Sequence, residues 1–307
     1  MNWKGFKPQL LSNDEFGLDD LDYTAMVASF KHDGVRVECT KEGLFNRSLK
    51  ELPNKELQEY FREFYETIPE DIVVEGEIWH LHKPCREIAG ICNSLHGGKD
   101  LDGMMIMLFD LADLNRDDLT ALGRNIVLST YYMKKWIESP KISLIHHIYV
   151  EDPVSVADFY EEAIKQGFEG LVLNDFRKTY KRGRVTINQH IGFKIKPEKE
   201  EELEIIGVNE RFINTNESEI NELGHKYKRN TVDNKQPSGL AGTFLCRLPN
   251  GNETKVTCTG TKEERKEMWE NSSDYIGRYV VVKSMNYGTK DKPRHPRMIK
   301  IKEKIEK

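Results

Sequence analysis

One lysine of the chain stands where its chemistry could be unusual. Lys31 follows an apolar, β-prone stretch (residues 23–30) and precedes a short turn, His32-Asp33-Gly34. Residues 35–40, which include Arg36, alternate in polarity and predict a second strand. We therefore expect Lys31 at a strand end, at the lip of a cleft. A lysine amine there can act as a covalent nucleophile if its surroundings remove its proton.

Seven further residues of suitable types lie near predicted strand ends or in neighbouring loops: Arg36, Arg47, Glu77, Phe109, Glu169, Lys194 and Lys196. Phe109 can stack on a base, and Glu77 can accept a ribose hydrogen bond or help to hold a metal. Lys194 and Lys196 are two apart on a predicted strand, so both point to one face. Two cations there suit a phosphate and favour the neutral form of a neighbouring lysine. Each residue alone is more often an ordinary surface or core residue, so order and spacing carry the prediction.

The composition bounds the class of protein. A chain of 307 residues with 38% hydrophobic residues predicts one large or two smaller globular domains. It contains no run of about 18 apolar residues and no signal-peptide pattern, so we expect neither a membrane span nor secretion. Five cysteines without a metal-type spacing favour a reducing compartment, the cytoplasm or that of a virus-infected host cell.

The charge distribution matters more than the total. A formal net charge of -5 argues against a uniformly basic nucleic-acid binder. Residues 177–197, however, hold seven basic residues and no acidic one, interleaved with aromatic residues. This run predicts an anion-facing surface, although a solvated loop is the usual fate of such a run.

The two parts of the chain differ in their predicted secondary structure. The first predicts an α+β domain, residues 1–199, with helices at 54–66, 86–95, 116–138 and 153–166 between strands. Residues 198–202, which span the boundary between the two parts, are predicted to form a charged connector. The second part, residues 200–307, predicts five short strands (203–209, 242–248, 253–259, 277–284 and 296–302) and a helix at 261–274. That pattern suits a small OB-fold β-barrel. Residues 210–239 form a long polar stretch between the first two barrel strands, which predicts a functional or disordered loop.

Eight short motifs occur in a fixed order: Lys7-Pro8-Gln9-Leu10, Lys31-His32-Asp33-Gly34-Val35-Arg36, Phe45-Asn46-Arg47-Ser48, Val74-Glu75-Gly76-Glu77, Leu108-Phe109-Asp110-Leu111, Glu169-Gly170-Leu171-Val172, Phe193-Lys194-Ile195-Lys196 and Pro293-Arg294-His295-Pro296. This series resembles the covalent nucleotidyltransferase superfamily, and specifically the small ATP-dependent DNA ligases of viruses and phages. Two departures stand out. Glu75 occupies a position where Asp is usual, and Lys302 replaces an Arg in the final motif.

The resemblance implies a fold and a nucleotide site. An N-terminal adenylyltransferase domain with antiparallel sheets would precede an OB-fold β-barrel whose latch-like insertion is 210–239. Lys31 would attack the α-phosphate of ATP and carry AMP covalently. Ser29 and Phe109 would contact the adenine, and Arg36 and Glu77 would contact the ribose. Lys194 and Lys196 would contact the α-phosphate, and Arg294 would orient the pyrophosphate. Glu169 and Glu77 would hold a metal ion, Mg²⁺ or Mn²⁺.

The resemblance also implies a partner, nicked duplex DNA, bound by a monomer through Arg47, Arg184, Lys226 and Lys228 during replication, repair or recombination. Two alternatives share the scaffold, an RNA ligase and a GTP-dependent mRNA capping guanylyltransferase. The Arg294-His295-Pro296 motif and the latch-like insertion favour the DNA ligase. A non-catalytic nick-binding protein is a third alternative, but it predicts the loss of a core motif, and all of them are present.

Overall fold

A computed structural model describes residues 6–12, 16–217, 219–220, 226–227, 234–287 and 291–302. The chain divides into two compact units, Met1–Ile195 and Lys196–Lys307, which are described separately. No helix among these described residues is long and apolar enough to cross a membrane. All five cysteines are free thiols, and four of them are buried.

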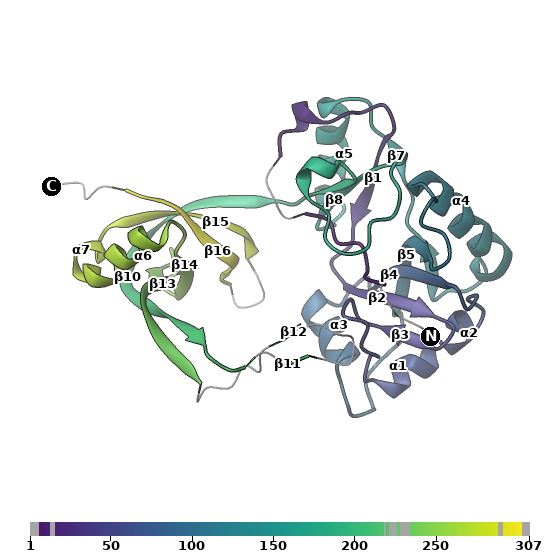
Figure 1. Cartoon of the computed structure of the whole chain (residues 1–307), viewed down its shortest axis with the longest axis horizontal. Helices are drawn as coiled ribbons and strands as arrows, with labels where there is room; N and C mark the ends of the chain where they lie inside the picture. Colours follow the sequence, from purple (N-terminus) through teal and green to yellow (C-terminus); the bar gives the residue numbers. More distant parts are fainter. Residues whose placement is uncertain are drawn as a thin grey trace. The chain divides into compact units, whose positions relative to one another are not determined.

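Two β-sheets form the frame of the first unit (Figure 1). The four-stranded sheet has the order β7-β1-β8-β9, with strands Ile148–Tyr149, Met26–Lys31, Gly170–Asp175 and Gly192–Ile195. The five-stranded sheet has the order β3-β2-β4-β5-β6, with strands Gly43–Phe45, Val35–Thr40, Ile72–Trp79, Met105–Asp113 and Ile142–Leu144. All neighbouring strands are antiparallel except β5 and β6. The expected α+β class with antiparallel sheets is confirmed.

The helices of this unit are α1 (Lys55–Tyr60), α2 (Arg62–Tyr65), α3 (Cys85–Cys92), α4 (Ala121–Tyr131) and α5 (Pro153–Lys165), with a π-helical turn η2 (Tyr132–Trp136) and 3₁₀ turns η1 (Leu18–Asp20) and η3 (Ile187–Gln189). The single helix expected at 54–66 is wrong, because the chain breaks at Phe61 between α1 and α2. The helix expected from 116 begins later, because the Thr120 hydroxyl accepts a hydrogen bond from Gly123 N and caps the helix there.

The five-stranded sheet has one apolar and one charged face. Val37, Val74 and Ile78 are fully buried in a core shared with the helices. Because side chains alternate along a strand, Arg36 and Glu38 on β2 and Glu75 and Glu77 on β4 point to the opposite face. The charged residues of the motifs are therefore collected on one side of the sheet.

A bulge adds Phe109 to this charged face. Glu75 pairs with Asp110 and Gly76 pairs with Leu108, so Phe109 is the additional residue of β5. Bulges redirect side chains and are frequent beside active sites. The ring of Phe109 lies under the guanidinium of Arg36, 5.2 Å from the ring centre to Cζ.

The second unit is a five-stranded β-structure in the order β10-β13-β14-β16-β15, in which β15 also pairs with β10. Its elements are β10 (Glu198–Asn214), β13 (Lys235–Arg247), β14 (Glu253–Thr257), α6 (Lys262–Glu270), α7 (Ser272–Tyr275), β15 (Tyr279–Tyr287) and β16 (Pro293–Ile301). The expected helix at 261–274 is interrupted at Asn271. The strand number and the single helical region agree with the expected OB-like domain.

The charged connector expected at 198–202 is wrong, because these residues are the first part of β10. They pair with β15 from Glu198 opposite Met285 to Glu202 opposite Val281. Lys283 forms an ion pair with Glu198, and Lys302 forms one with Glu202. Lys283 on the neighbouring strand β15 and Lys302 just after β16 thus compensate the low strand propensity of the glutamates.

The polar stretch 210–239 is not a plain loop. Strands β10 and β13 continue their pairing as far as Asn214 opposite Lys235, so the insertion leaves the barrel as a β-ribbon. Two further strands within it, β11 (Glu219–Ile220) and β12 (Lys226–Tyr227), pair with each other. Lys228 lies outside the described residues, and of Lys226 only the backbone is described.

Substitution of Gly34 should destabilise the first unit. A Cβ atom at Gly34 would lie 2.2 Å from the backbone oxygen of Ile78 and 2.8 Å from Cγ of Glu77. We expect Gly34→Ala to lower the free energy of unfolding by about 1–3 kcal/mol, as overpacking does. The matched control is Gly90→Ala in α3, where nothing lies within 4 Å of the new Cβ and a gain of about 0.5–1 kcal/mol is expected. Urea unfolding measures the free energy of unfolding of both variants. Equal stability of the two would contradict the close packing of Gly34 against Ile78 and Glu77.

Candidate active site

Lys31 is the last residue of β1, and its ammonium group forms an ion pair with the carboxylate of Glu169. The backbone N–H of Glu169 donates to the oxygen of Lys31 at 2.8 Å, so the two residues are fixed to each other twice. Both side chains are largely buried, with 20% and 13% of their surface exposed. An amine can attack only without its proton and free of such a partner, so this ion pair has to open before Lys31 can act as a nucleophile.

Strand register places further expected residues on the sheet face that carries Lys31. Ser29 pairs with Val172, and Val172 pairs with Lys194 on the next strand. Ser29 and Lys31 are two residues apart, so they share a face with this row. Neighbouring strands are about 4.8 Å apart. Lys194 therefore lies within about 10 Å of Ser29, measured between backbones.

Glu77 connects the two sheets at this site. Its Oε1 accepts a hydrogen bond from the backbone N–H of Gly34 at 3.2 Å, in the turn that follows Lys31. Burial raises the pKa of the Glu77 carboxyl to about 7, against the lowering effect of Lys31 and Arg36 and with a further contribution from Glu169. The charges of Lys31 and Glu169 therefore both affect the protonation of the Glu77 carboxyl.

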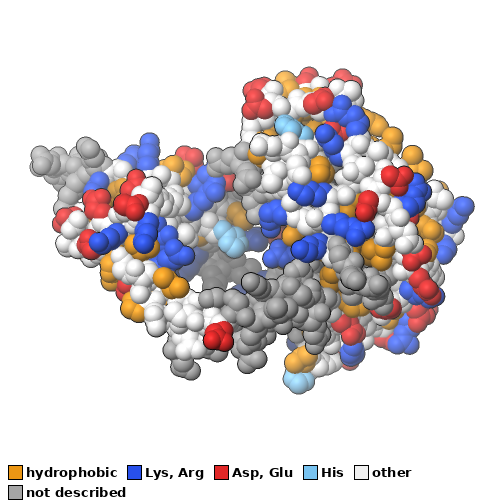
Figure 2. All heavy atoms as spheres, in the orientation of Figure 1, with side chains coloured by type: hydrophobic (Ala, Val, Ile, Leu, Met, Phe, Trp, Pro, Cys, Tyr) orange, Lys and Arg blue, Asp and Glu red, His pale blue; other side chains and the backbone are white. Residues whose placement is uncertain are grey.

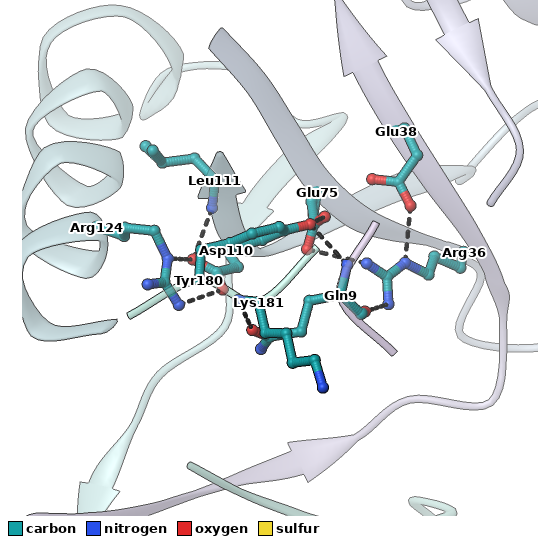
Figure 3. A network of polar contacts seen from close by, with 9 residues as sticks. All are labelled: Gln9, Arg36, Glu38, Glu75, Asp110, Leu111, Arg124, Tyr180 and Lys181. Atoms are coloured by element: carbon teal, nitrogen blue, oxygen red, sulfur yellow. Dashed lines mark hydrogen bonds and ion pairs between the residues drawn. The ribbon is translucent and has the colours of Figure 1, made fainter. Parts of the chain in front are cut away.

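Arg36 is held by three partners from three segments (Figure 3). Its Nε donates to Oε1 of Glu38 at 2.9 Å, and Nη1 donates to the backbone oxygen of Gln9 at 2.9 Å. Its Nη2 lies 2.9 Å from Oε2 of Glu75. Burial disfavours the guanidinium charge, but Glu75 and Glu38 outweigh it and raise the pKa of Arg36. Of its five N–H donors, Nη1 keeps one beyond the bond to Gln9, whereas Nη2 is buried beside Glu75.

The polar network continues behind Arg36 through residues that the sequence did not single out. The Tyr180 hydroxyl donates to Oε1 of Glu75 and accepts from the backbone N–H of Gln9 at 2.7 Å. On the other side, Arg124 donates to both oxygens of Asp110 at 2.8 and 2.9 Å. Arg124 is 2% exposed and sits in a helix that otherwise looks amphipathic. Among the residues of this network, Glu38 could have been found from the sequence, because it lies two residues after Arg36 on a predicted strand and therefore shares its face.

A divalent cation fits the carboxylates beside Lys31. No group of three or more His, Cys, Asp or Glu side chains in the described part of the chain is arranged to hold a metal ion. Magnesium, however, is commonly held by one or two carboxylates together with substrate phosphates. Glu169 and Glu77 are hard oxygen donors of that kind. Burial raises the pKa of Glu77 in spite of Lys31 and Arg36, and a bound cation would favour its charged form.

The basic run 177–197 is only partly available to anions. Arg177 forms ion pairs with Asp22 and Asp175, and Arg182 forms one with Asp117. Arg184 is exposed, and its Nη1 donates to the backbone oxygen of Leu11 at 3.2 Å. The anion-facing surface expected from the run is therefore narrower than the residue count suggests.

Of the remaining expected residues, Arg47 lies in a loop of the first unit, and Lys196 and Arg294 belong to the second unit. Arg47 is exposed in a tight turn in which the N–H of Leu49 donates to the oxygen of Asn46. Lys196 is the first residue of the second unit, and Arg294 is exposed on β16 of that unit. The first unit by itself brings together Ser29, Lys31, Lys194 and Glu169 on one sheet and Arg36, Glu77 and Phe109 on the other.

Replacement of Glu77 should raise stability in a pH-dependent way. Because the folded pKa of about 7 exceeds the usual value of 4.5, the proton on Glu77 stabilises the fold below pH 4.5, and this contribution is lost as the pH rises through 7. Glu77→Gln keeps an oxygen acceptor for Gly34 and carries no charge. We expect it to exceed the wild type at pH 8 by at most about 3 kcal/mol and to approach it at pH 5.

Urea unfolding at both pH values measures this difference. The control is Glu63→Gln, an exposed position on α2 that should show no gain at either pH. A difference for Glu77→Gln that stays constant between pH 5 and pH 8 would show that its carboxyl is not perturbed.

Two family models match the chain. One, described as an ATP dependent DNA ligase domain, matches residues 12–196, and the other, a DNA ligase OB-like domain, matches residues 234–302. A probable DNA ligase of Persephonella marina is 24% identical over 164 residues, which are 49% of this chain and 28% of the relative. One of Aquifex aeolicus is 25% identical over 185 residues, 54% of this chain and 31% of the relative. The chain thus covers about 30% of the length of these two relatives.

Solved structures share the fold over nearly the whole chain. A Lig E DNA ligase, studied for DNA binding with a minimal scaffold, superposes with a TM-score of 0.72 at 17% identity, covering 96% of this chain and 99% of its own. Chlorella virus DNA ligase-adenylate superposes with a TM-score of 0.54 at 20% identity, covering 98% and 99%. The match to residues 12–196 alone spans more than half of the 307 residues, so the chain belongs to the ATP-dependent DNA ligase family of enzymes.

Proposed function

We propose that this protein seals nicks with 5′-phosphate and 3′-hydroxyl ends in duplex DNA through AMP carried on Lys31. The observation that carries the proposal is the position of Lys31 at the end of β1. There Ser29, Lys194 and the Glu169 carboxylate share its sheet, and Glu77 reaches the turn that follows it.

In the first step, Nζ of Lys31 forms a bond to the α-phosphorus of ATP, the bond to the leaving oxygen breaks, and pyrophosphate departs. The amine must be neutral to attack, so its proton passes to solvent, and the ion pair with Glu169 has to open for Nζ to reach the phosphorus. Glu169 and Glu77 would hold a divalent cation, which neutralises phosphate charge when bound. Lys194 and Lys196 would contribute positive charge at the α-phosphate.

The nucleoside part of ATP would occupy the second sheet. Nη1 of Arg36 has one N–H donor beyond its bond to Gln9, and Glu77 offers carboxylate oxygen to a ribose hydroxyl. The half-buried ring of Phe109 offers an aromatic surface to adenine, with Ser29 near the base. Pre-formed contacts of this kind lower the entropic cost of binding.

The AMP would then pass to the 5′-phosphate of a nick, and attack by the 3′-hydroxyl would release AMP and form the phosphodiester bond. On the face drawn in Figure 2, Lys and Arg side chains gather in the middle of the first unit. Arg47 and Arg184 are exposed cations suited to DNA phosphates, and Arg294 would orient the leaving pyrophosphate. Phosphate contacts predict binding that is independent of sequence and weakened by salt.

Loss of the Lys31 amine should abolish the first step. We expect α-labelled ATP with Mg²⁺ to label the wild-type protein, and Lys31→Ala to lose at least about 100-fold of that label and of nick sealing, because the nucleophile itself is gone. Lys41→Ala is the control, since Lys41 is an exposed lysine of the same unit that pairs with Glu70. Label from GTP alone would favour a capping enzyme, and sealing of nicked RNA alone would favour an RNA ligase.

The insertion should contribute to DNA binding and not to adenylylation. Replacing residues 215–234 by Asn-Gly would close the ribbon with a two-residue turn between Asn214 and Lys235, which are register partners. We expect affinity for nicked duplex to fall by about tenfold or more at fixed salt, because backbone-phosphate contacts are lost. Label on Lys31 should stay within about twofold of the wild type. Unchanged affinity would remove the insertion from the binding surface, and loss of label would assign it a structural role.

A further inference from the structure

Three carboxyl groups lie side by side on the charged face of the five-stranded sheet. Glu38 is opposite Glu75, and Glu75 is opposite Asp110, so one row crosses β2, β4 and β5. Glu38 and Glu75 are 0% and 1% exposed. Like charges directly opposite each other are unfavourable, and burial increases their cost. Each carboxyl therefore needs a donor.

Arginines meet all three carboxyl groups and a tyrosine meets the middle one, while Oε2 of Glu38 is buried without a hydrogen-bond partner. Arg36 pairs with Glu38 and Glu75, and Arg124 pairs with Asp110. The remaining oxygen of Glu75, Oε1, accepts from the Tyr180 hydroxyl (Figure 3). Tyr180 reaches this row from a segment more than 60 residues beyond β5, and its ring lies over Arg124 at 5.2 Å.

The same hydroxyl also fixes Gln9. It accepts from the backbone N–H of Gln9 at 2.7 Å, while the oxygen of Gln9 accepts from Nη1 of Arg36. The side-chain Oε1 of Gln9 accepts from the backbone N–H of Lys181 at 2.8 Å. Two paths thus join Tyr180 to Arg36, one through the carboxylate of Glu75 and one through the backbone of Gln9.

We infer that Tyr180 is a positioning residue for ATP: through Glu75 and Gln9, its hydroxyl holds the Arg36 guanidinium in the orientation that contacts the ribose. The inference rests on the proposed function, in which Arg36 contacts the ribose of ATP. Tyr180 itself touches neither the reacting amine of Lys31 nor Glu169 in any described contact. Its effect is on nucleotide binding and not on the chemical step.

Tyr180→Phe tests this, because it removes only the hydroxyl and keeps the ring over Arg124. We expect the KM for ATP in protein adenylylation to rise about tenfold, while the rate at saturating ATP changes less than about twofold, because the ribose contact binds ground state and transition state alike. A second readout is the ribose itself. The discrimination between ATP and 2′-deoxy- or 3′-deoxy-ATP should shrink in the variant, since the effects of removing the sugar hydroxyl and the tyrosine hydroxyl overlap.

Two further variants keep the test decisive. Tyr23→Phe is the matched control, since the Tyr23 hydroxyl donates to the oxygen of Leu18 at 2.8 Å away from this network. Glu75→Asp keeps the charge but shortens the reach by one methylene. It should therefore reproduce the KM effect and not add to it in the double variant with Tyr180→Phe.

The possible failures are distinct. If the wild type takes no label from ATP, the proposed function falls. If the wild type is labelled but Tyr180→Phe matches Tyr23→Phe in KM and in ribose discrimination, the positioning role falls. A Tyr180→Phe protein that loses maximal rate and thermal stability together, with KM unchanged, would also overturn it, because that is the pattern of a structural residue.

Discussion

The ion pairs between Arg36 and the buried carboxylates of β2 and β4 are the contacts on which the first unit depends. A charge on an inner strand of a covered sheet has to be compensated where it stands, because desolvation costs several kcal/mol per ion. Removing one partner leaves the other unpaired and buried. This requirement explains why segments distant in the chain, around Gln9 and Tyr180, converge on the sheet beside Arg36.

Lys31 obeys the same electrostatics on the neighbouring sheet. Lys31 is neutralised by Glu169, and Glu77 stands close enough for both charges to influence its proton. In this arrangement Nζ of Lys31 is engaged by the Glu169 carboxylate. Groups that would bind phosphate and cation are already assembled around it, so the arrival of a nucleotide changes the partners of these charges more than their positions. Reactivity would then depend on the substrate being present.

Much of this organisation could be predicted from the residues in order. The turn after Lys31 and the strand at 72–79 follow from local patterns and strand periodicity, whereas the shared face of Lys194 and Ser29 depends on the register of three strands. Contacts between distant segments could not be predicted in this way. Tyr180 and Glu75 are 105 positions apart, and the glutamates of β10 read as a connector because Lys283 and Lys302 lie far along the chain. The bulge at Phe109 has no signature in polarity, since Leu108, Phe109 and Leu111 are all apolar.

The bulge determines what the deletion of one residue would do to this strand. Leu108 and Asp110 already face their partners Gly76 and Glu75, so the ladder between β4 and β5 would be regular if Phe109 were absent. The aromatic ring is therefore an insertion into a sheet that is complete without it. Loss of this one codon would keep every other side chain of the strand on its own face, whereas most deletions in a strand reverse them. Folding and the base contact proposed for Phe109 could accordingly change independently here, and a lineage could gain or discard the ring without rebuilding the core.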